Sequence, residues 1–112
     1  MIRRGDVYLA RIAIESGQGQ AERHVVIISR EALNRNSPVV VVVPIVEKGS
    51  RRRIYPSHMS LRAGEGGISE ESIVLGEQVR AINVSKLVRQ VGQLAPHRVA
   101  EVSATLKIVL DL

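Results

Sequence analysis

The stretch "VVVVVPIV", residues 39–46, is the longest apolar run in the sequence. β-Branched side chains occupy almost every position, and eight residues are too few for a typical helix. A strand without polar alternation is buried on both faces, so we expect this run to be the central strand of a sheet. Pro44 has no N–H to donate to a neighbouring strand, which predicts a bulge, a strand end or an edge at that position.

Shorter apolar segments, separated by turn-forming residues, flank this run on both sides. A short helical turn is expected over 29–36, between the second strand and the valine run. We expect one unbroken strand over 72–82, with a bulge or a close backbone approach at Gly76. The remaining strands are predicted within residues 6–14, 23–29, 54–61 and 83–94.

The pattern changes to a helical period at the C-terminal end. Pro96 suits the first position of a helix, and apolar residues then recur every three or four positions, at Val99, Val102, Leu106 and Val109. We therefore predict an amphipathic helix docked on a β core. The fold class is mainly β (α+β), a small curved antiparallel sheet or partly open barrel, with residues 1–112 forming a single domain.

Positive charge is concentrated in the first half of the chain. Residues 1–62 hold eleven basic and five acidic side chains, and residues 63–112 hold five and six. A one-sided basic field is typical of proteins that bind nucleic acid or acidic peptides. The alternative is a basic surface without a binding partner.

Several kinds of site are excluded or disfavoured by residue content. The chain has no cysteine, which removes disulfides, thiolate nucleophiles and cysteine-based zinc sites. His24, His58 and His97 do not occur at metal-ligand spacings, and no P-loop or dinucleotide-binding motif is present, so we expect neither a metal nor a cofactor. No run is long enough to span a bilayer and no signal peptide is visible, so we expect no membrane association and a cytoplasmic location.

Polar residues suited to phosphate chemistry remain on several strands and in one loop. Arginine is a natural stabiliser of phosphoryl charge and a poor general base at neutral pH. Period-two alternation predicts that Gln78 and Arg80 share one strand face while Glu77 takes the other, and that Arg23 and His24 point to opposite faces. Taken alone, Arg23 fits a surface salt bridge at a strand start better than a catalytic role.

The order of motifs along the whole chain resembles the MazF/PemK family of toxins. The motifs in sequence are "RRGDVYLA", a Gly/Gln-rich loop leading to "RHVVIIS", then "NRNSPVVVVVPI", "PSHM", "GGISEESIVLGEQVRAI" and "VGQL" before the helix. The resemblance implies an SH3-like barrel that forms a homodimer. It also implies a sequence-specific endoribonuclease that cuts single-stranded RNA without metal, leaving a 2′,3′-cyclic phosphate and a 5′-OH, and that is inhibited by the acidic tail of an antitoxin.

The resemblance also implies roles for particular residues. The family's catalytic arginine falls on Arg23, with His24 in place of the proline that usually follows. Val46 occupies the family's second catalytic position, where a Thr or Ser is expected, and valine keeps the shape of threonine without its hydroxyl. The RNA-binding set is then predicted to be Gln18, Gln20, Arg51, Arg52, Arg53, His58, Gln78 and Arg80.

Three outcomes are compatible with a valine at position 46. The protein is a weak nuclease, another group such as Ser50 or Gln78 substitutes for the missing hydroxyl, or the protein binds RNA or an antitoxin without cutting. A fourth activity, poisoning of DNA gyrase as in the related CcdB toxins, is a minor alternative.

Overall fold

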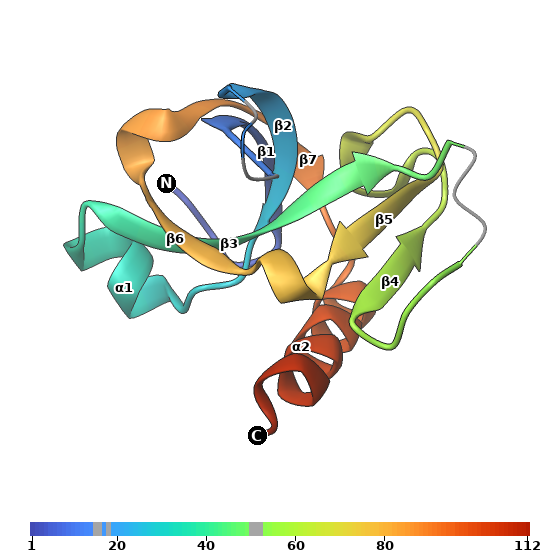
Figure 1. Ribbon diagram of the computed structural model, residues 1–112. Coiled ribbons are helices and arrows are strands. Elements are labelled where there is room, and N and C mark those ends of the chain that lie inside the picture. Colours follow the sequence, from blue (N-terminus) through green and yellow to red (C-terminus); the bar gives the residue numbers. More distant parts are fainter. Residues whose placement is uncertain (15–16, 18, 50–52) are drawn as a thin grey trace.

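The computed structural model describes residues 1–14, 17, 19–49 and 53–112. Within these ranges a seven-stranded antiparallel sheet has the order β4-β5-β3-β2-β1-β7, with β6 also paired to β3. The path has two ends, so the sheet curves without closing (Figure 1). The strands are β1 Asp6–Ile12, β2 Ala21–Ile27, β3 Val39–Glu47, β4 His58–Leu61, β5 Ser72–Leu75, β6 Arg80–Asn83 and β7 Leu87–Gln93.

Two α-helices and three 3₁₀ turns complete the described chain. The short helix α1 is Glu31–Asn36 and the long helix α2 is Pro96–Leu110; the turns are η1 Glu65–Gly67, η2 Gly76–Gln78 and η3 Val84–Lys86. The predicted mainly-β fold with one short internal helix and one C-terminal helix is confirmed. No helix within the described ranges combines the length and apolar character needed to cross a membrane.

Strand β3 is the centre of the sheet, as the valine run predicts. One of its edges pairs with β2, through residues 42–45. Its other edge is divided between two partners, since residues 39–42 pair with β6 and residues 45–47 pair with β5. Figure 1 shows β3 crossing the molecule, with β6 beside its first half and β5 beside its second half.

Pro44 lies where the partner of β3 changes, which differs from the predicted bulge, strand end or sheet edge. Ile28 N–H donates to the Val41 carbonyl, which marks Val41 as a residue that bonds to β2. Hydrogen-bonded positions alternate along an antiparallel strand, so Val43 and Ile45 also bond to β2. The Pro44 nitrogen therefore faces the opposite edge of β3. On that edge β6 pairs only as far as Val42 and β5 starts at Ile45. The missing N–H therefore costs neither ladder a hydrogen bond.

The side chains of β3 enter two separate apolar clusters. Val43 and Ile45 belong to the helix-side core, which also contains Met59, Leu61 and Val102. Val40 and Val42 belong to the strand-side core, which also contains Val25, Ile27 and Ile73. The prediction that the valine run is buried on both faces is thus confirmed, because successive side chains of a strand point to opposite faces.

Helix α2 docks through the apolar stripe that its periodicity predicts. Val102 is fully buried, and Val99 and Leu106 pack against the helix-side core. Burying one such side chain contributes about 1.5–3 kcal/mol.

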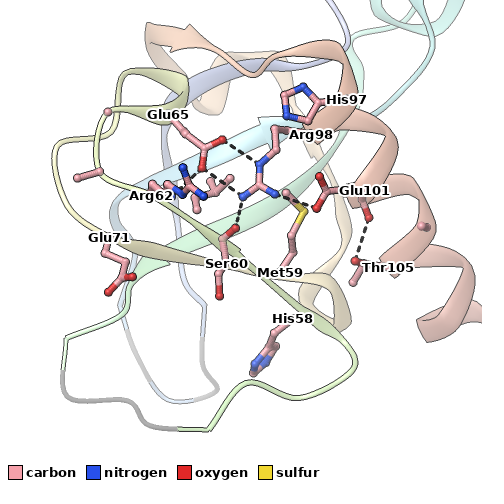
Figure 2. Close-up of a pocket in the computed structure, with 14 residues that line it drawn as sticks. His58, Met59, Ser60, Arg62, Glu65, Glu71, His97, Arg98, Glu101 and Thr105 are labelled. Carbon is pink, nitrogen blue, oxygen red and sulfur yellow. Dashed lines mark hydrogen bonds and ion pairs between the residues drawn. The ribbon is translucent and has the colours of Figure 1, made fainter.

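An ion-pair cluster holds the first turns of α2 against β4 and the loop that follows it. Figure 2 shows Arg98 at the centre of this cluster, reaching Glu65, Glu101 and the backbone of Ser60. Arg98 Nε donates to Glu65 Oε1 at 2.8 Å and Nη1 donates to Glu101 Oε2 at 2.8 Å. A cleft of about 1090 Å³ lies between these elements, lined also by Arg62, Glu71 and His97.

The Glu65 carboxylate is stabilised in its charged form by this cluster. Burial, the largest single influence, would raise the pKa of Glu65. The hydrogen bonds from the Arg62 backbone N–H and from the Arg98 guanidinium, together with the charge of both arginines, outweigh it and lower the pKa. Ionised Glu65 therefore contributes to the stability of the fold.

The predicted unbroken strand over 72–82 is wrong. It divides into β5 and β6, separated by the 3₁₀ turn η2, because the chain must leave one half of β3 and join the other. The predicted close backbone approach at Gly76 is confirmed. Gly76 N–H donates to the Ser57 carbonyl at 2.9 Å, and a Cβ at position 76 would lie 2.5 Å from that oxygen.

We expect Gly76→Ala to lower the free energy of unfolding by about 1–3 kcal/mol, since the added methyl group has no space against the Ser57 backbone. Thermal unfolding followed by circular dichroism measures the change. Gly19→Ala is the matched control, because a Cβ at Gly19 meets nothing within 4 Å. Equal melting temperatures for the two variants would contradict the packing argument.

We expect Arg98→Gln to lower the free energy of unfolding by about 1–3 kcal/mol at pH 7, because it removes the guanidinium that forms an ion pair with Glu65. The pKa of Glu65 is lowered by folding, so its stabilising effect is present above its ordinary pKa of 4.5 and is lost as the pH falls through the folded value. Melting curves from pH 7 to pH 3 should therefore converge for the two proteins. Lys107→Gln, at an exposed position of α2, is the control. A difference in melting temperature between wild type and Arg98→Gln that stays constant in acid, or an equal loss of stability in Lys107→Gln, would contradict this role.

Candidate functional site

Arg23 and Val46 lie one position beyond the end of the β2–β3 ladder. The last pair of that ladder is His24 with Ile45, and extending the antiparallel register by one step places Arg23 opposite Val46. Arg23 also pairs with Ala10 of β1, and Val46 pairs with Ile73 of β5. Directly opposed residues share a sheet face, so the two positions that the resemblance marks as catalytic lie side by side.

Both side chains sit at the margin of the strand-side core. Val46 is half-buried and packs against that core. Arg23 is half-buried as well, and its Nε atom is enclosed. The strand register thus sets an arginine on the same sheet face as a residue with the shape of threonine but no hydroxyl.

His24 lies on the opposite face, as alternation predicts, because β2 continues in regular register with both neighbours. Burial lowers the pKa of His24, nearby Arg89 lowers it further, and Glu47 opposes these two effects. Its ordinary pKa is 6.5, so this imidazole is mostly neutral at pH 7. His24 is therefore not part of a shared site with Arg23.

Gln78 and Arg80 contact each other, although the predicted strand face that they were to share does not exist. Gln78 ends the η2 turn and Arg80 begins β6. Arg80 Nη2 donates to Gln78 Oε1 at 2.7 Å, Arg80 Nε donates to the Gln78 carbonyl at 3.1 Å, and Nη1 donates to the Ala13 carbonyl. The guanidinium thereby fastens the end of β1 to the start of β6.

Gln20 lies beside this guanidinium at the start of β2. Gln20 and Arg80 line the same cleft of about 400 Å³. Lys86 Nζ donates to Gln20 Oε1 at 3.3 Å and lines the cleft as well. Sequence reasoning missed Lys86, and no local signal marks it, because its partner is 66 positions away in the chain.

His58 begins β4, at the far end of the sheet from β1, and both of its ring nitrogens have partners. Nδ1 accepts from the Tyr55 backbone N–H at 3.3 Å, and Nε2 lies 3.2 Å from Glu77 Oε1. An accepting Nδ1 requires the proton of the neutral ring to sit on Nε2, where it faces the carboxylate. The predicted RNA-binding imidazole is thus held by the η2 turn and by its own loop.

Arg53 and Tyr55 continue this set of contacts toward the surface. The Tyr55 and His58 rings meet at right angles, with centroids 5.3 Å apart. The Arg53 guanidinium carbon lies 5.9 Å from the Tyr55 ring centroid. Gln18, Arg51 and Arg52, the other predicted RNA-binding residues, and Ser50, the predicted substitute, lie outside the described residues.

Strand alternation relates these groups to one another. His58 pairs with Leu75, and Leu75 lies on the same face of β5 as Ile73, the partner of Val46. One face of the sheet therefore carries His58 of β4, Val46 of β3 and Arg23 of β2. Strands β5 and β3 lie between His58 and Arg23. Met59 alternates to the other face, toward α2, and Figure 2 shows His58 pointing away from the Arg98 cluster.

The described residues include no group of three or more His, Asp or Glu side chains placed to hold a metal ion. The polar groups that line the cleft at Arg80 include guanidinium, amide and ammonium donors. Such groups suit oxyanions of phosphate, which arginine binds in bidentate fashion.

Comparison with known proteins places this geometry among related chains. A family model described as "PemK-like, MazF-like toxin of type II toxin-antitoxin system" matches residues 3–110. A curated relative, Endoribonuclease MazF of Staphylococcus saprophyticus, is 33% identical over 113 aligned positions, which cover 100% of this chain and 93% of the relative.

Solved structures share the fold at lower identity. An endoribonuclease in complex with its cognate antitoxin, from a mycobacterial species, superposes with a TM-score of 0.79 at 21% identity, covering 100% of this chain and 97% of that one. MazF from Deinococcus radiodurans gives a TM-score of 0.79 at 23% identity, covering 99% and 97%. At these identities the superpositions establish the likeness of fold.

Proposed function

Because this chain belongs to the family of PemK-like, MazF-like toxins of type II toxin–antitoxin systems, we propose that it is an endoribonuclease that cleaves single-stranded RNA at specific sequences without a metal ion. The proposal is supported by the strand register, which, extended one step beyond the His24–Ile45 pair, sets Arg23 and Val46 on one face of the sheet. The proposed substrate is messenger RNA.

The proposed reaction is an internal transfer of the phosphoryl group. The ribose 2′-oxygen loses its proton and bonds to the adjacent phosphorus, the bond from phosphorus to the 5′-oxygen breaks, and that oxygen takes up a proton. The products are a 2′,3′-cyclic phosphate and a 5′-OH. Arg23 is assigned the role of stabilising negative charge on the phosphoryl oxygens, which a fixed guanidinium does throughout the neutral pH range.

The remaining predicted residues are assigned to binding the strand. The proposed RNA-contacting set is Gln18, Gln20, Arg51, Arg52, Arg53, His58, Gln78 and Arg80. Gln20 and Arg80 support this by lining one cleft with Lys86. The internal hydrogen bonds of Arg80 and His58 give these two a positioning role as well as a contact role.

Val46 favours a second candidate function. A valine neither donates nor accepts a hydrogen bond, so one group that the family's reaction uses is absent from the Arg23 face. Loss of one such group commonly reduces the rate about 10²–10³-fold. The alternative is a weak or inactive toxin that binds RNA or an antitoxin without turnover, since Val46 still fills its place against the strand-side core.

The proposed partners follow from charge and family. The excess of basic residues in positions 1–62 supports capture of an acidic antitoxin tail, and one structural neighbour is itself in complex with its cognate antitoxin. We further propose that residues 1–112 form one toxin domain, that two copies form a homodimer, and that the protein acts in the cytoplasm.

We expect the purified protein to cut a long single-stranded RNA in the presence of EDTA. The new ends should carry a 2′,3′-cyclic phosphate and a 5′-OH and should cluster at one short sequence. Primer extension maps the cut positions, direct labelling by polynucleotide kinase tests for the 5′-OH, and resistance of the 3′ end to phosphatase until acid treatment tests for the cyclic phosphate. Cleavage that disappears with EDTA, or that produces 5′-phosphates, would contradict the proposed reaction, and binding without cleavage would favour the alternative.

We expect Arg23→Ala to abolish cleavage and Val46→Thr to raise its rate by about 10–10³-fold, because threonine restores a hydroxyl beside the guanidinium. Single-turnover rates on one mapped site measure both effects. Val46→Ala, which changes the side chain without adding a hydroxyl, is the control for Val46→Thr. A threonine variant no faster than the alanine variant would show that position 46 takes no part in the reaction.

A further inference from the structure

We propose that Tyr55 is a stacking platform for one base of the RNA strand, bound together with Arg53 at a subsite several strands away from Arg23. The inference rests on the proposed function, because it names how the same substrate is gripped at a second point. Its subject is an aromatic side chain that neither the family match nor the roles assigned above include.

The first observation is the exposure of the ring. Tyr55 is 51% exposed, and the other tyrosine of the chain, Tyr8, is half-buried between β2 and β7. The chain contains no tryptophan and no phenylalanine. An exposed aromatic face loses water and gains dispersion contacts when a base stacks on it, and such stacking is worth about 1–3 kcal/mol per base.

The second observation is that the exposed ring is held in place. Tyr55 N–H donates to His58 Nδ1, and His58 N–H donates back to the Tyr55 carbonyl at 2.8 Å. The His58 ring, whose side chain is only 8% exposed, meets the Tyr55 ring at right angles and is itself held by Glu77. A side chain ordered before binding loses less conformational entropy when its ligand arrives.

The third observation is the cation beside the ring. The guanidinium of Arg53 lies 5.9 Å from the Tyr55 centroid, within the range of a cation–π contact. The side chain of Arg53 is exposed and available to a phosphate. An aromatic face next to a cation is the combination that proteins use to bind single-stranded nucleic acid, where the ring takes a base and the cation takes the backbone.

The fourth observation is the location relative to Arg23. His58, which fixes the ring, lies on the same sheet face as Val46 and Arg23, with β5 and β3 between β4 and β2. Three strand spacings amount to about 15 Å. A single strand of a few nucleotides therefore reaches from the phosphate at Arg23 to a base on Tyr55.

The experiment uses labelled single-stranded 2′-O-methyl oligonucleotides of mixed sequence, about 10 nucleotides long, which lack the nucleophilic hydroxyl and cannot be cut. Fluorescence anisotropy gives the Kd. We expect Tyr55→Leu to raise the Kd about fivefold or more, and Tyr55→Phe to leave it within about twofold. The exposed neighbour Ile54→Ala serves as control and should leave the Kd unchanged.

Two further readouts separate stacking from charge. Tyrosine emission of the wild-type protein should be quenched by the oligonucleotides, and an abasic strand with the same backbone should not quench it. The dependence of log Kd on log salt should keep its slope in Tyr55→Leu and fall by about 0.7 in Arg53→Gln, because only the arginine releases a counterion from the strand. The quenching needs no variant, so it tests the platform even if Tyr55→Leu unfolds.

Cleavage of unmodified RNA by the wild-type protein, assayed in parallel, distinguishes the two proposals. If the protein cuts RNA but Tyr55→Leu binds as tightly as wild type, the platform is refuted and the nuclease stands. Quenching by the abasic strand, or by an acidic peptide but not by RNA, also refutes the platform. Absence of both binding and cleavage refutes the proposed function and the platform together.

Discussion

The arrangement of the whole molecule depends on the sharing of one edge of β3 between two strands. A strand has two hydrogen-bonding edges, and β3 serves β2 with one and both β5 and β6 with the other. The changeover falls at residues 43–44, where the proline nitrogen needs no partner. This division sets Val46 opposite Ile73 and Arg80 opposite Val42, and it leaves the η2 turn between the two halves. The turn carries Glu77 and Gln78, so it touches His58 on one side and Arg80 on the other.

Local pattern predicts much of this fold because burial acts directly on residue type. The valine run and the C-terminal stripe around Val102 are visible as apolar spacing, and the short helix predicted over 29–36 is visible from the residues that start and stop it. The break at Gly76 is not visible in the same way. A β-branched run with one glycine fits a bulged strand as well as two strands, and the choice between them is made by the Ser57 carbonyl and by the two available sections of β3, both distant in sequence.

Local sequence pattern predicts the candidate site less well than it predicts the fold. Only the family resemblance singles out Arg23 and Val46, and their placement on one sheet face depends on the register between β2 and β3. A prediction from charge alone assumes that every arginine and histidine side chain is free to donate to the substrate. In the fold, Arg80 donates to Ala13 and Gln78, and His58 is engaged by Tyr55 and Glu77. These partners lie up to 67 positions away, so charge patterning cannot separate a contact residue from one that fixes its neighbours.

The bond from Arg80 to Ala13 bears on how this protein can diverge. The acceptor is a backbone carbonyl, which every residue type supplies, so the anchor of the β1 end does not depend on which side chain stands at position 13. The hydrogen bond thus holds the backbone directly after β1 in place whichever side chain stands there. A substitution at Ala13 therefore leaves the acceptor of this hydrogen bond in place, whereas a substitution of Arg80 removes its donor.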